Sequence, residues 1–398
     1  MVEQIVMQKE TSYLPPEIIT NILVRLTVRY LIQFQCVCKD WKNLLKTPSF
    51  IEKHLDHSTQ QNPLLAFNCS IYESDDNACH LSLNNRDETE VLEFQNPPIV
   101  HLLKASLMLV HSSNGLLCLD LQTIKFHSSW LWNPSYSFWL WNPAIREVQQ
   151  VPQSLDKYKI DTISVGFGFS PIVNDYKIVK LFLLGALVAE VEVYALRRGC
   201  WRKVKFGNLE GIRLVSESGF AWNGSIFWIG LEKESHLGLI VSFDIALEVF
   251  TLLPFLTESH ALKLYDIMFT TYDNKLALLS PTRNHESSFI DLWVMEECTN
   301  ESKERWVWTK IYRSRPCPRW RLYPMIIWRN EIVCTVIAKH QRGIEDEMED
   351  DEAKVLFCNL TTNEFNVFAF PAKCKFTGQV LNYVESLVPV RSIQIEEP

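Results

Sequence analysis

The sequence predicts a multi-domain α+β protein in which a small all-α unit precedes an all-β, propeller-like domain. Between about residues 14 and 57, apolar residues recur at spacings of three and four, which is typical of helices. From about residue 62 onward, short apolar runs alternate with Gly, Asn, Asp and Pro turns, which is typical of strands. A unit of about four strands also recurs along this second part at roughly 50 to 60 residues, the period of propeller blades.

The composition favours a soluble protein in a reducing compartment. The net charge of −8 over 398 residues argues against a general nucleic-acid binder and is compatible with a basic partner. Eleven cysteines without a CxxC pair, and an N-terminus without a signal peptide pattern, predict a cytoplasmic or nuclear location rather than secretion. The longest apolar run, Leu181–Ala189, is far shorter than the roughly 20 residues of a membrane span.

The N-terminal unit is predicted to contain about three helices. Pro15 or Pro16 suits the first position of a helix, with Ser12 as a candidate cap. Thr27 can cap a second helix, and a third is expected at Pro48–Leu55. The apolar positions of the first two helices are Ile18, Ile19, Ile22, Leu23, Leu26, Leu31, Phe34, Val37, Cys38, Trp41, Leu44 and Leu45.

This helical unit carries more apolar surface than it can bury alone. A segment of about forty residues buries a smaller fraction of its chain than a larger domain does. The surplus apolar face is therefore expected either to dock onto another protein or to pack on the rest of this chain. The residues alone leave both alternatives open.

The repeated strand unit predicts both the blades and the closure of their ring. Residues 64–110 hold a more degraded copy, and the C-terminal run Gln379–Val390 is expected to close the ring by pairing with the first blade. Tryptophan and phenylalanine side chains are expected to pack between neighbouring blades. An open pair of β-sandwiches is the competing fold, which the repeat disfavours. The clear copies begin near Asn114, Gly166, Gly219, Asp266 and Met325.

Residues 14–45 read LPPEIITNILVRLTVRYLIQFQCVCKDWKNLL and contain a motif with fixed spacing. The order Leu-Pro-x-Glu-Ile, Ile-Leu-x-Arg-Leu and Val-Cys-Lys-x-Trp resembles an F-box. Thr27 stands where plant members usually carry proline, which affects only the stiffness of the link between two helices. The matching positions are Leu14, Pro15, Glu17, Ile18, Ile22, Leu23, Arg25, Leu26, Val28, Leu31, Phe34, Val37, Cys38, Lys39 and Trp41.

The second region carries further short motifs, namely Ser113–Cys118, Leu140–Pro143, Gly166–Phe169, Asn174–Val179, Val193–Tyr194, Trp201, Asn223–Gly224, Phe227–Trp228, Phe243–Asp244 and Tyr383–Leu387. Together they resemble the plant F-box-associated domain of the F-box/kelch-like group. The order of the two regions is similar to that of S-locus F-box proteins. The expected boundaries are a flexible N-terminus at 1–11, an F-box at 12–57, the propeller-like domain at 58–393 and a tail at 394–398.

The resemblance implies a substrate receptor of an SCF-type ubiquitin ligase. The F-box would bind a Skp-type adaptor, the adaptor would bridge to a cullin scaffold, and the propeller would hold an unknown target protein for ubiquitination and degradation. The chain would be non-catalytic, without cofactor or metal. The alternative is a non-ligase interaction scaffold with a degenerate F-box. The implied adaptor-binding residues are Leu14, Pro15, Ile18, Ile22, Leu26, Val28, Leu31, Val37, Cys38 and Trp41.

Catalytic and metal signals are weak. The sequence has no nucleophile elbow, phosphate loop or dinucleotide fingerprint. His54 and His57 have helical spacing but lack partners at ligand spacing, so we expect them at the solvated surface. Cys36 and Cys38 are expected to be packing residues.

Two charged runs are candidates for target binding. The basic run RSRPCPRWR is either a solvated loop between blades or a site that binds an acidic partner or nucleic acid, with Arg319 and Trp320 as the candidate residues. The acidic run Glu345–Glu352 is either a solvated loop tip or an attraction for a basic target.

The five residues WLWNP occur twice, at Trp130–Pro134 and Trp139–Pro143. The second copy continues as AIREVQQVP and fits the single Trp-Asn-Pro of the family pattern, so the first copy is the extra one. Because proline favours a turn, we expect an added hairpin with strands near 129–132 and 137–141 and a turn at 133–135. Its aromatic residues, of which at least one is expected to be partly exposed, are candidates for target binding: Trp130, Tyr136 and Trp139.

Overall fold

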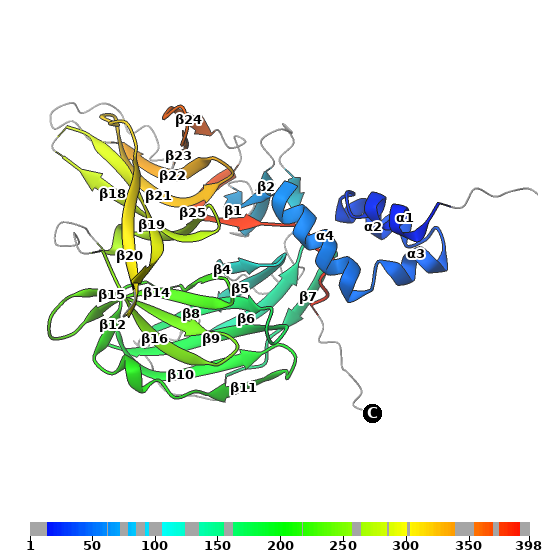
Figure 1. Ribbon diagram of the computed structural model, residues 1–398, viewed down its shortest axis with the longest axis horizontal. Coiled ribbons are helices and arrows are strands. Elements are labelled where there is room, and N and C mark those ends of the chain that lie inside the picture. Colours follow the sequence, from blue (N-terminus) through cyan, green and yellow to red (C-terminus); the bar gives the residue numbers. More distant parts are fainter. Residues whose placement is uncertain are drawn as a thin grey trace, which may run out of the picture.

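The computed structural model places a helical unit at one side of a large all-β domain (Figure 1). It describes residues 14–61, 63–71, 79–84, 92–94, 106–123, 135–154, 162–216, 218–256, 264–284, 286–300, 303–338, 354–368 and 374–390.

The helical unit contains four helices within the described residues, rather than about three. The expected second helix is interrupted because Cys38 takes an extended backbone, with φ −156° and ψ 164°. The Cys38 Sγ accepts a hydrogen bond from the Trp41 N–H at 3.4 Å, which starts a new helix. The helix expected at Pro48–Leu55 runs further. The four helices are α1 (Pro16–Leu23), α2 (Val28–Phe34), α3 (Lys39–Leu44) and α4 (Pro48–Gln61).

These helices pack around a small apolar core that includes the buried Leu23, Val28 and Leu31. His54 of α4 lies at the edge of this core and is buried, so the expectation of a solvated His54 was wrong. Its Nε2 donates a hydrogen bond to the Leu26 carbonyl at 2.9 Å. Burial lowers the pKa of His54, and the ring therefore makes this bond as the neutral imidazole. This hydrogen bond attaches α4 to the segment between α1 and α2, which contains Leu26.

The β domain is a propeller of six four-stranded antiparallel blades within the described residues, as the sequence repeat predicts. Four blades are separate sheets. Blades 3 and 4 share one nine-stranded sheet, because the short strand β12 (Ile212–Leu214) pairs with a strand of each. The open β-sandwich alternative is therefore wrong.

Blade 1 consists of β25 (Cys374–Tyr383), β1 (Leu64–Ile71), β2 (Cys79–Asn84) and β3 (Leu92–Phe94). Blade 2 consists of β4 (Ser106–Ser113), β5 (Leu116–Thr123), β6 (Ser135–Asn142) and β7 (Glu147–Gln150). Blade 3 consists of β8 (Thr162–Ser170), β9 (Asp175–Leu184), β10 (Leu187–Ala195) and β11 (Cys200–Lys203).

Blade 4 consists of β13 (Phe220–Trp222), β14 (Ser225–Glu232), β15 (Gly238–Asp244) and β16 (Val249–Pro254). Blade 5 consists of β17 (Met268–Tyr272), β18 (Lys275–Arg283), β19 (Ser288–Asn300) and β20 (Lys303–Arg313). Blade 6 consists of β21 (Trp320–Trp328), β22 (Glu331–Ala338), β23 (Lys354–Asn359) and β24 (Phe365–Phe368). The 3₁₀ helices η1 (Gly207–Leu209) and η3 (Leu264–Asp266) lie in connections.

The ring is closed by the first and last strands of the β domain. Strand β25 pairs antiparallel with β1, from Leu64↔Tyr383 to Ile71↔Cys374. The predicted closure of the ring by the C-terminal run is thus confirmed, although pairing already ends at Tyr383. Closure leaves the first and last strands paired rather than presenting free edges.

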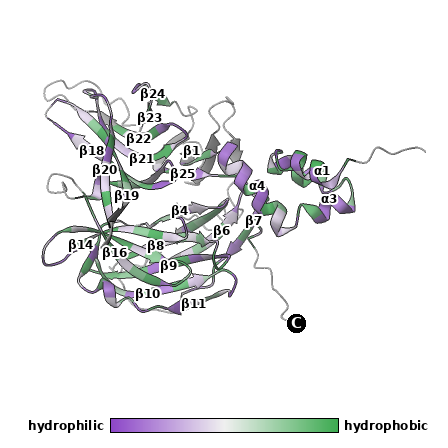
Figure 2. Cartoon of the chain, viewed as in Figure 1, coloured by the Kyte–Doolittle hydropathy of each residue, from purple (hydrophilic) through white to green (hydrophobic). Residues whose placement is uncertain are grey.

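Aromatic side chains fill the seams between blades, as expected. Between blades 4 and 5, Phe269 lies with its ring centroid 6.1 Å from that of Phe220 and 6.2 Å from that of Phe227. These rings belong to one buried cluster that draws on both blades. Figure 2 shows hydrophobic segments along the strands, and also in the helical unit.

Residues 384–390 leave blade 1 and cross blade 2; we call them the C-terminal strap. Gly115 in the β4–β5 turn permits this crossing, because a Cβ at that position would lie 2.3 Å from the Ser386 Oγ and 2.7 Å from the Val384 carbonyl oxygen. Gly115 also has φ +79°, and Asn114 has φ 49°, as the two-residue hairpin turn requires. The Asn-Gly motif therefore serves both the turn and the crossing.

Asn142 holds the C-terminal strap on blade 2. Its Nδ2 donates to the Ser386 carbonyl at 3.0 Å and to the Val388 carbonyl at 2.8 Å. Its Oδ1 accepts from the Ala144 N–H at 3.0 Å, which shapes the turn that follows β6. Because Asn142 is fully buried, no water can replace these bonds.

The C-terminal strap also joins the helical unit to the propeller. Leu387 packs in the core of the helices together with Ala144 and Ile145 of blade 2. The Glu385 Oε2 accepts a hydrogen bond from the Val28 N–H, the first residue of α2, at 3.4 Å. Packing on the rest of the chain, one of the two alternatives for the surplus apolar surface, is therefore confirmed for this face.

The second WLWNP copy lies in β6, between β5 and β7. Leu117 of β5 faces Trp141, and Thr123 faces Ser135. Ser135 is thus the first residue of a strand and not part of the expected turn. Strand β6 pairs with β5 on one edge and with β7 on the other. The other expected hairpin strand, near 129–132, lies outside the described residues.

We expect Asn142→Ala to lower the stability of the whole protein by about 2 kcal/mol or more, because one buried and one partly buried carbonyl group of the strap lose their donor. The measurement is the melting temperature of the full chain by differential scanning calorimetry. Asn359→Ala is the matched control, since Asn359 accepts from the Thr361 and Thr362 N–H groups in the corresponding turn of blade 6 but holds no strap. Equal losses in the two variants would contradict the role given to the strap.

We expect Glu385→Gln to raise the melting temperature at neutral pH. Burial raises the pKa of the Glu385 carboxyl. A raised folded-state pKa means that stability is fully present below the unfolded-state pKa and is lost as the pH rises through the folded-state value. The amide keeps an acceptor for the Val28 N–H but removes the buried charge, so the gain should vanish in acid.

Glu147→Gln is the control for this prediction. The Glu147 Oε2 accepts from the Val390 N–H of the same strap at 3.0 Å; this residue is half-buried like Glu385, but it lies at the start of β7 and does not contact the first residue of α2. No comparable stabilisation is expected from it. A pH-independent effect of Glu385→Gln would contradict the proposed cause.

Candidate functional site

The helical unit exposes an apolar stripe on the side of α1 that does not face the core. Leu14, Ile18 and Ile22 are spaced by four residues and are 53%, 45% and 50% exposed. The intervening Ile19 and the following Leu23 pack into the core of the unit. Helix α1 is therefore apolar on two sides, and among the residues that the structure describes only one of these sides is covered.

The turns of the unit add to the exposed residues. Val37, between α2 and α3, is exposed, as is Pro15 before α1. Cys36 and Cys38 are also exposed, which corrects the expectation that they are packing residues. Cys38 is exposed because it caps α3 and therefore lies at the N-terminal end of that helix.

Four of the residues implied by the resemblance lie inside the unit or at its border. Val28 and Leu31 have an exposed fraction of 0%, so in this conformation they support the exposed face from beneath and cannot contact a partner directly. Leu26 and Trp41 are partly buried at the edge of the same core, where the Trp41 ring lies 5.6 Å from that of Phe34. The sequence could not separate these roles, because both sides of α1 and α2 are apolar.

The aromatic residues of the doubled motif do not form an exposed site in the described part of the chain. Trp139 is only 9% exposed, and its Nε1 donates to the Ser137 Oγ at 3.1 Å. It is a buried residue of a central strand, which corrects its selection as a target contact. Trp130 and the side chain of Tyr136 lie outside what the structure describes.

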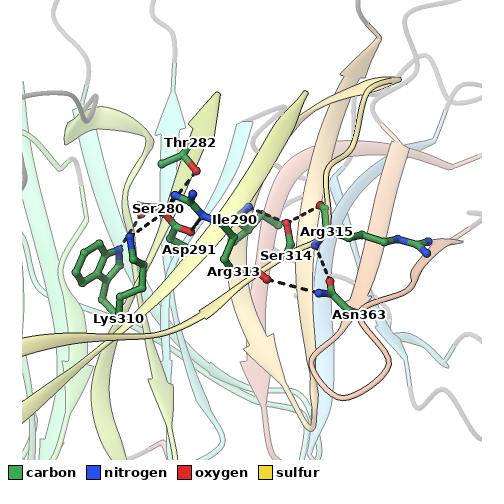
Figure 3. Close-up of polar contacts among 10 residues, drawn as sticks. Ser280, Thr282, Ile290, Asp291, Lys310, Arg313, Ser314, Arg315 and Asn363 are labelled. Carbon is green, nitrogen blue, oxygen red and sulfur yellow. Dashed lines mark hydrogen bonds and ion pairs between the residues drawn. The ribbon is translucent and has the colours of Figure 1, made fainter. Parts of the chain in front are cut away.

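The basic run forms the connection between blades 5 and 6, as one of the two expectations had it. Arg313 is not available for a partner, because its Nε and an Nη bind the two carboxylate oxygens of the buried Asp291 at 2.6 and 2.8 Å (Figure 3). Arg319 is exposed, and its guanidinium lies 5.0 Å from the centroid of the partly buried Trp320 ring. The acidic run Glu345–Glu352 lies outside the described residues.

Sequence reasoning missed two residues that the fold brings to this basic run. The Lys354 Nζ lies 5.7 Å from the Trp320 ring centroid, and the Arg315 guanidinium lies 5.5 Å from that of Phe365. Lys354 begins β23 and Phe365 begins β24. Lys354 and Phe365 do not belong to any of the sequence motifs, so only the pairing of strands within blade 6 shows that they lie beside the basic run.

Across the described residues, no group of three or more His, Cys, Asp or Glu side chains is placed to hold a metal ion. One buried cation there is paired within the fold: Lys177 contacts both the Glu248 carboxylate and the Ile245 carbonyl at 2.5 Å. Among the described helices, none combines the length and the apolar composition needed to cross a bilayer.

Several known F-box proteins of one plant, Arabidopsis thaliana, have similar sequences. An F-box/kelch-repeat protein of Arabidopsis thaliana is 29% identical over 61% of this chain and 65% of its own length. An F-box only protein of the same plant is 23% identical over 74% of this chain and 75% of its own. A further Arabidopsis thaliana F-box protein is 25% identical over 60% and 58%. The chain thus spans less than two thirds of the length of two of these three relatives.

Two family matches cover the two parts of the fold. Residues 12–53 match the F-box domain, and these residues contain α1, α2, α3 and the start of α4. Residues 68–377 match the F-box associated beta propeller domain, which is more than half of the chain. The chain therefore belongs to the F-box associated beta propeller family, with an F-box domain preceding its propeller.

Proposed function

We propose that this protein is the substrate receptor of an SCF-type ubiquitin ligase, in which the F-box binds a Skp-type adaptor and the propeller binds a target protein. The observation that carries this proposal is the exposed stripe of Leu14, Ile18 and Ile22 on a helix whose other side is already packed. Covering such side chains contributes about 1.5 kcal/mol or more for each one that is fully buried. A protein surface is the partner that such a stripe fits.

The seam between the two domains supports the same proposal. Leu387 in the core of the helices and Glu385 at the start of α2 attach the F-box directly to the propeller. A target held by the propeller would therefore stay at a defined position relative to the adaptor and the cullin scaffold. This raises the effective concentration of its lysines at the ubiquitin-conjugating enzyme, and the chain itself supplies no chemistry.

The alternative, a scaffold with a degenerate F-box, gains no support from Thr27. This residue precedes α2 with φ −66° and makes no side-chain capping bond. A proline would take the same φ. The departure from the usual plant pattern therefore leaves the backbone of the link in the conformation that proline would impose.

We expect the double variant Ile18→Asp, Ile22→Asp to bind a Skp-type adaptor about 100-fold more weakly, since losing two apolar anchors costs about 3 kcal/mol. The measurement is titration of the purified full chain with a purified adaptor, by calorimetry or by pull-down at increasing adaptor concentration. Ile172→Asp is the matched control, because Ile172 is a highly exposed isoleucine on the propeller. Its adaptor affinity should equal that of the unmodified chain.

Melting temperatures of the three chains show whether each variant is folded. Full adaptor binding by a folded Ile18→Asp, Ile22→Asp chain would refute the assignment of this face. If the adaptor bound but the reconstituted complex recruited no cullin scaffold, the scaffold function would replace the receptor function.

A further inference from the structure

Blade 6 carries a groove whose lining is basic and aromatic. Its volume is about 420 Å³, within the range of roughly 300–1,000 Å³ of ligand-binding pockets. One wall is the connection from blade 5, and the other is formed by β23 and β24. In Figure 1, β24 lies at the top of the view, away from α1 and α3 at the right. We call it the blade 6 groove; its main lining residues are Arg315, Pro318, Arg319, Trp320, Phe365 and Val367.

The connection that forms the first wall is held firmly before any ligand arrives. Arg313 anchors its start through the two bonds to Asp291 (Figure 3). The Ser314 Oγ accepts from the Ile290 N–H at 2.9 Å, and the Arg315 N–H donates to the Asn363 Oδ1 at 2.8 Å.

The middle of this connection is fixed as well. Ser288 and Cys317 exchange two backbone hydrogen bonds, at 3.0 and 2.9 Å, which attach the connection to the start of β19. Both residues are buried. The backbone of the connection therefore loses little conformational entropy when a ligand binds to the side chains that the connection exposes.

Three cations lie over the aromatic rings of this groove, and two of them, Arg315 and Arg319, also line it. Arg315 lies over Phe365, whereas Arg319 and Lys354 both lie over Trp320. Of the carboxylates that the structure describes, none pairs with these three cations, and Glu364, which precedes Phe365, does not line the groove. This differs from the neighbouring Arg313, whose charge is compensated by Asp291.

This arrangement is complementary to carboxylates. A guanidinium stacked on a ring keeps its N–H groups free at the edge, where they can bind a carboxylate through two parallel hydrogen bonds. The exposed Val367 and the prolines beside Arg319 offer apolar surface between the cations. A peptide with acidic residues flanking an apolar one would use both features.

Charge favours a peptide over a nucleic acid as the occupant. A nucleic-acid site gains affinity from many phosphate contacts, whereas this groove is lined by two arginines, with Lys354 near its Trp320 ring, on a chain of net charge −8. The same positive groove repels a basic segment. It therefore points away from the basic target that the acidic run at 345–352 suggested.

We propose that the blade 6 groove binds a short acidic segment of a partner protein, with carboxylates on Arg315 and Arg319 and an apolar side chain between them. This inference rests on the proposed receptor function, because it names the kind of target segment that the propeller holds.

The test measures binding of a fluorescein-labelled twelve-residue peptide in which Glu and Asp alternate with Leu and Pro. Fluorescence polarisation is recorded with the full chain at low and at physiological salt. We expect saturable binding that weakens with salt, and no binding of the matched peptide in which Gln and Asn replace every acid. We expect the double variant Arg315→Gln, Arg319→Gln to bind the acidic peptide at least about tenfold more weakly.

Arg198→Gln is the matched control, because Arg198 is an exposed arginine of blade 3 outside the groove. It should leave peptide affinity unchanged. Adaptor binding is measured on all chains and is expected to stay at the level of the unmodified protein. Loss of peptide binding therefore reports on the groove, whereas failure of adaptor binding reports on the receptor function.

Several results would overturn the proposal. The first is equal peptide affinity in the double variant and in Arg198→Gln. The second is tighter binding of a twelve-nucleotide single-stranded DNA than of the acidic peptide, which would make the groove a nucleic-acid site. The third is binding that arises only after the carboxylates of Glu345–Glu352 are replaced by amides, which would assign the groove to the chain's own acidic run.

Discussion

The close contact between the C-terminal strap and blade 2 is the constraint on which the arrangement of both domains depends. The strap can cross there because Gly115 has no side chain to meet Ser386, and it stays there because Asn142 donates to two of its carbonyls. The same crossing places Leu387 in the core of the helices. One short segment thus follows the strand that closes the propeller and then seats the F-box on it, so the two domains share a common structural element.

This sharing has an electrostatic cost. Glu385 is brought to the start of α2, where its carboxylate accepts from the Val28 N–H, and burial raises its pKa. A helix N-terminus favours a negative charge, which partly offsets the loss of hydration. The result is a seam that fixes the exposed α1 stripe relative to the propeller, and hence relative to the blade 6 groove. A receptor that works by proximity depends on such a fixed relation.

The residues that the sequence assigned wrongly share one physical cause. Cys38 was placed inside a helix and instead caps one; His54 was expected in solvent and instead donates to the Leu26 carbonyl. Trp139 is one of three aromatic candidates for target binding in the sequence, but β5 and β7 cover its strand on both edges and the side chain is buried. In each case the decisive neighbour is not visible in the local pattern of apolar residues, which alone supports a prediction of this kind.

The sequence by itself determined the helical start and the repeated strand unit with its five clear copies, because these follow from local periodicity and from turn residues such as Asn114 and Gly115. The closure of the ring by the C-terminal run followed from the repeat, whereas the number of blades came only from the structure. It also determined the family, since the F-box motif and each motif of the second domain are short continuous stretches of sequence. Only the tertiary structure decided which apolar residues of the F-box are exposed, because Val28 and Glu385 meet across 357 positions. The blade 6 groove has the same origin, since strand pairing alone brings Lys354 and Phe365 beside the arginines of the connection between blades.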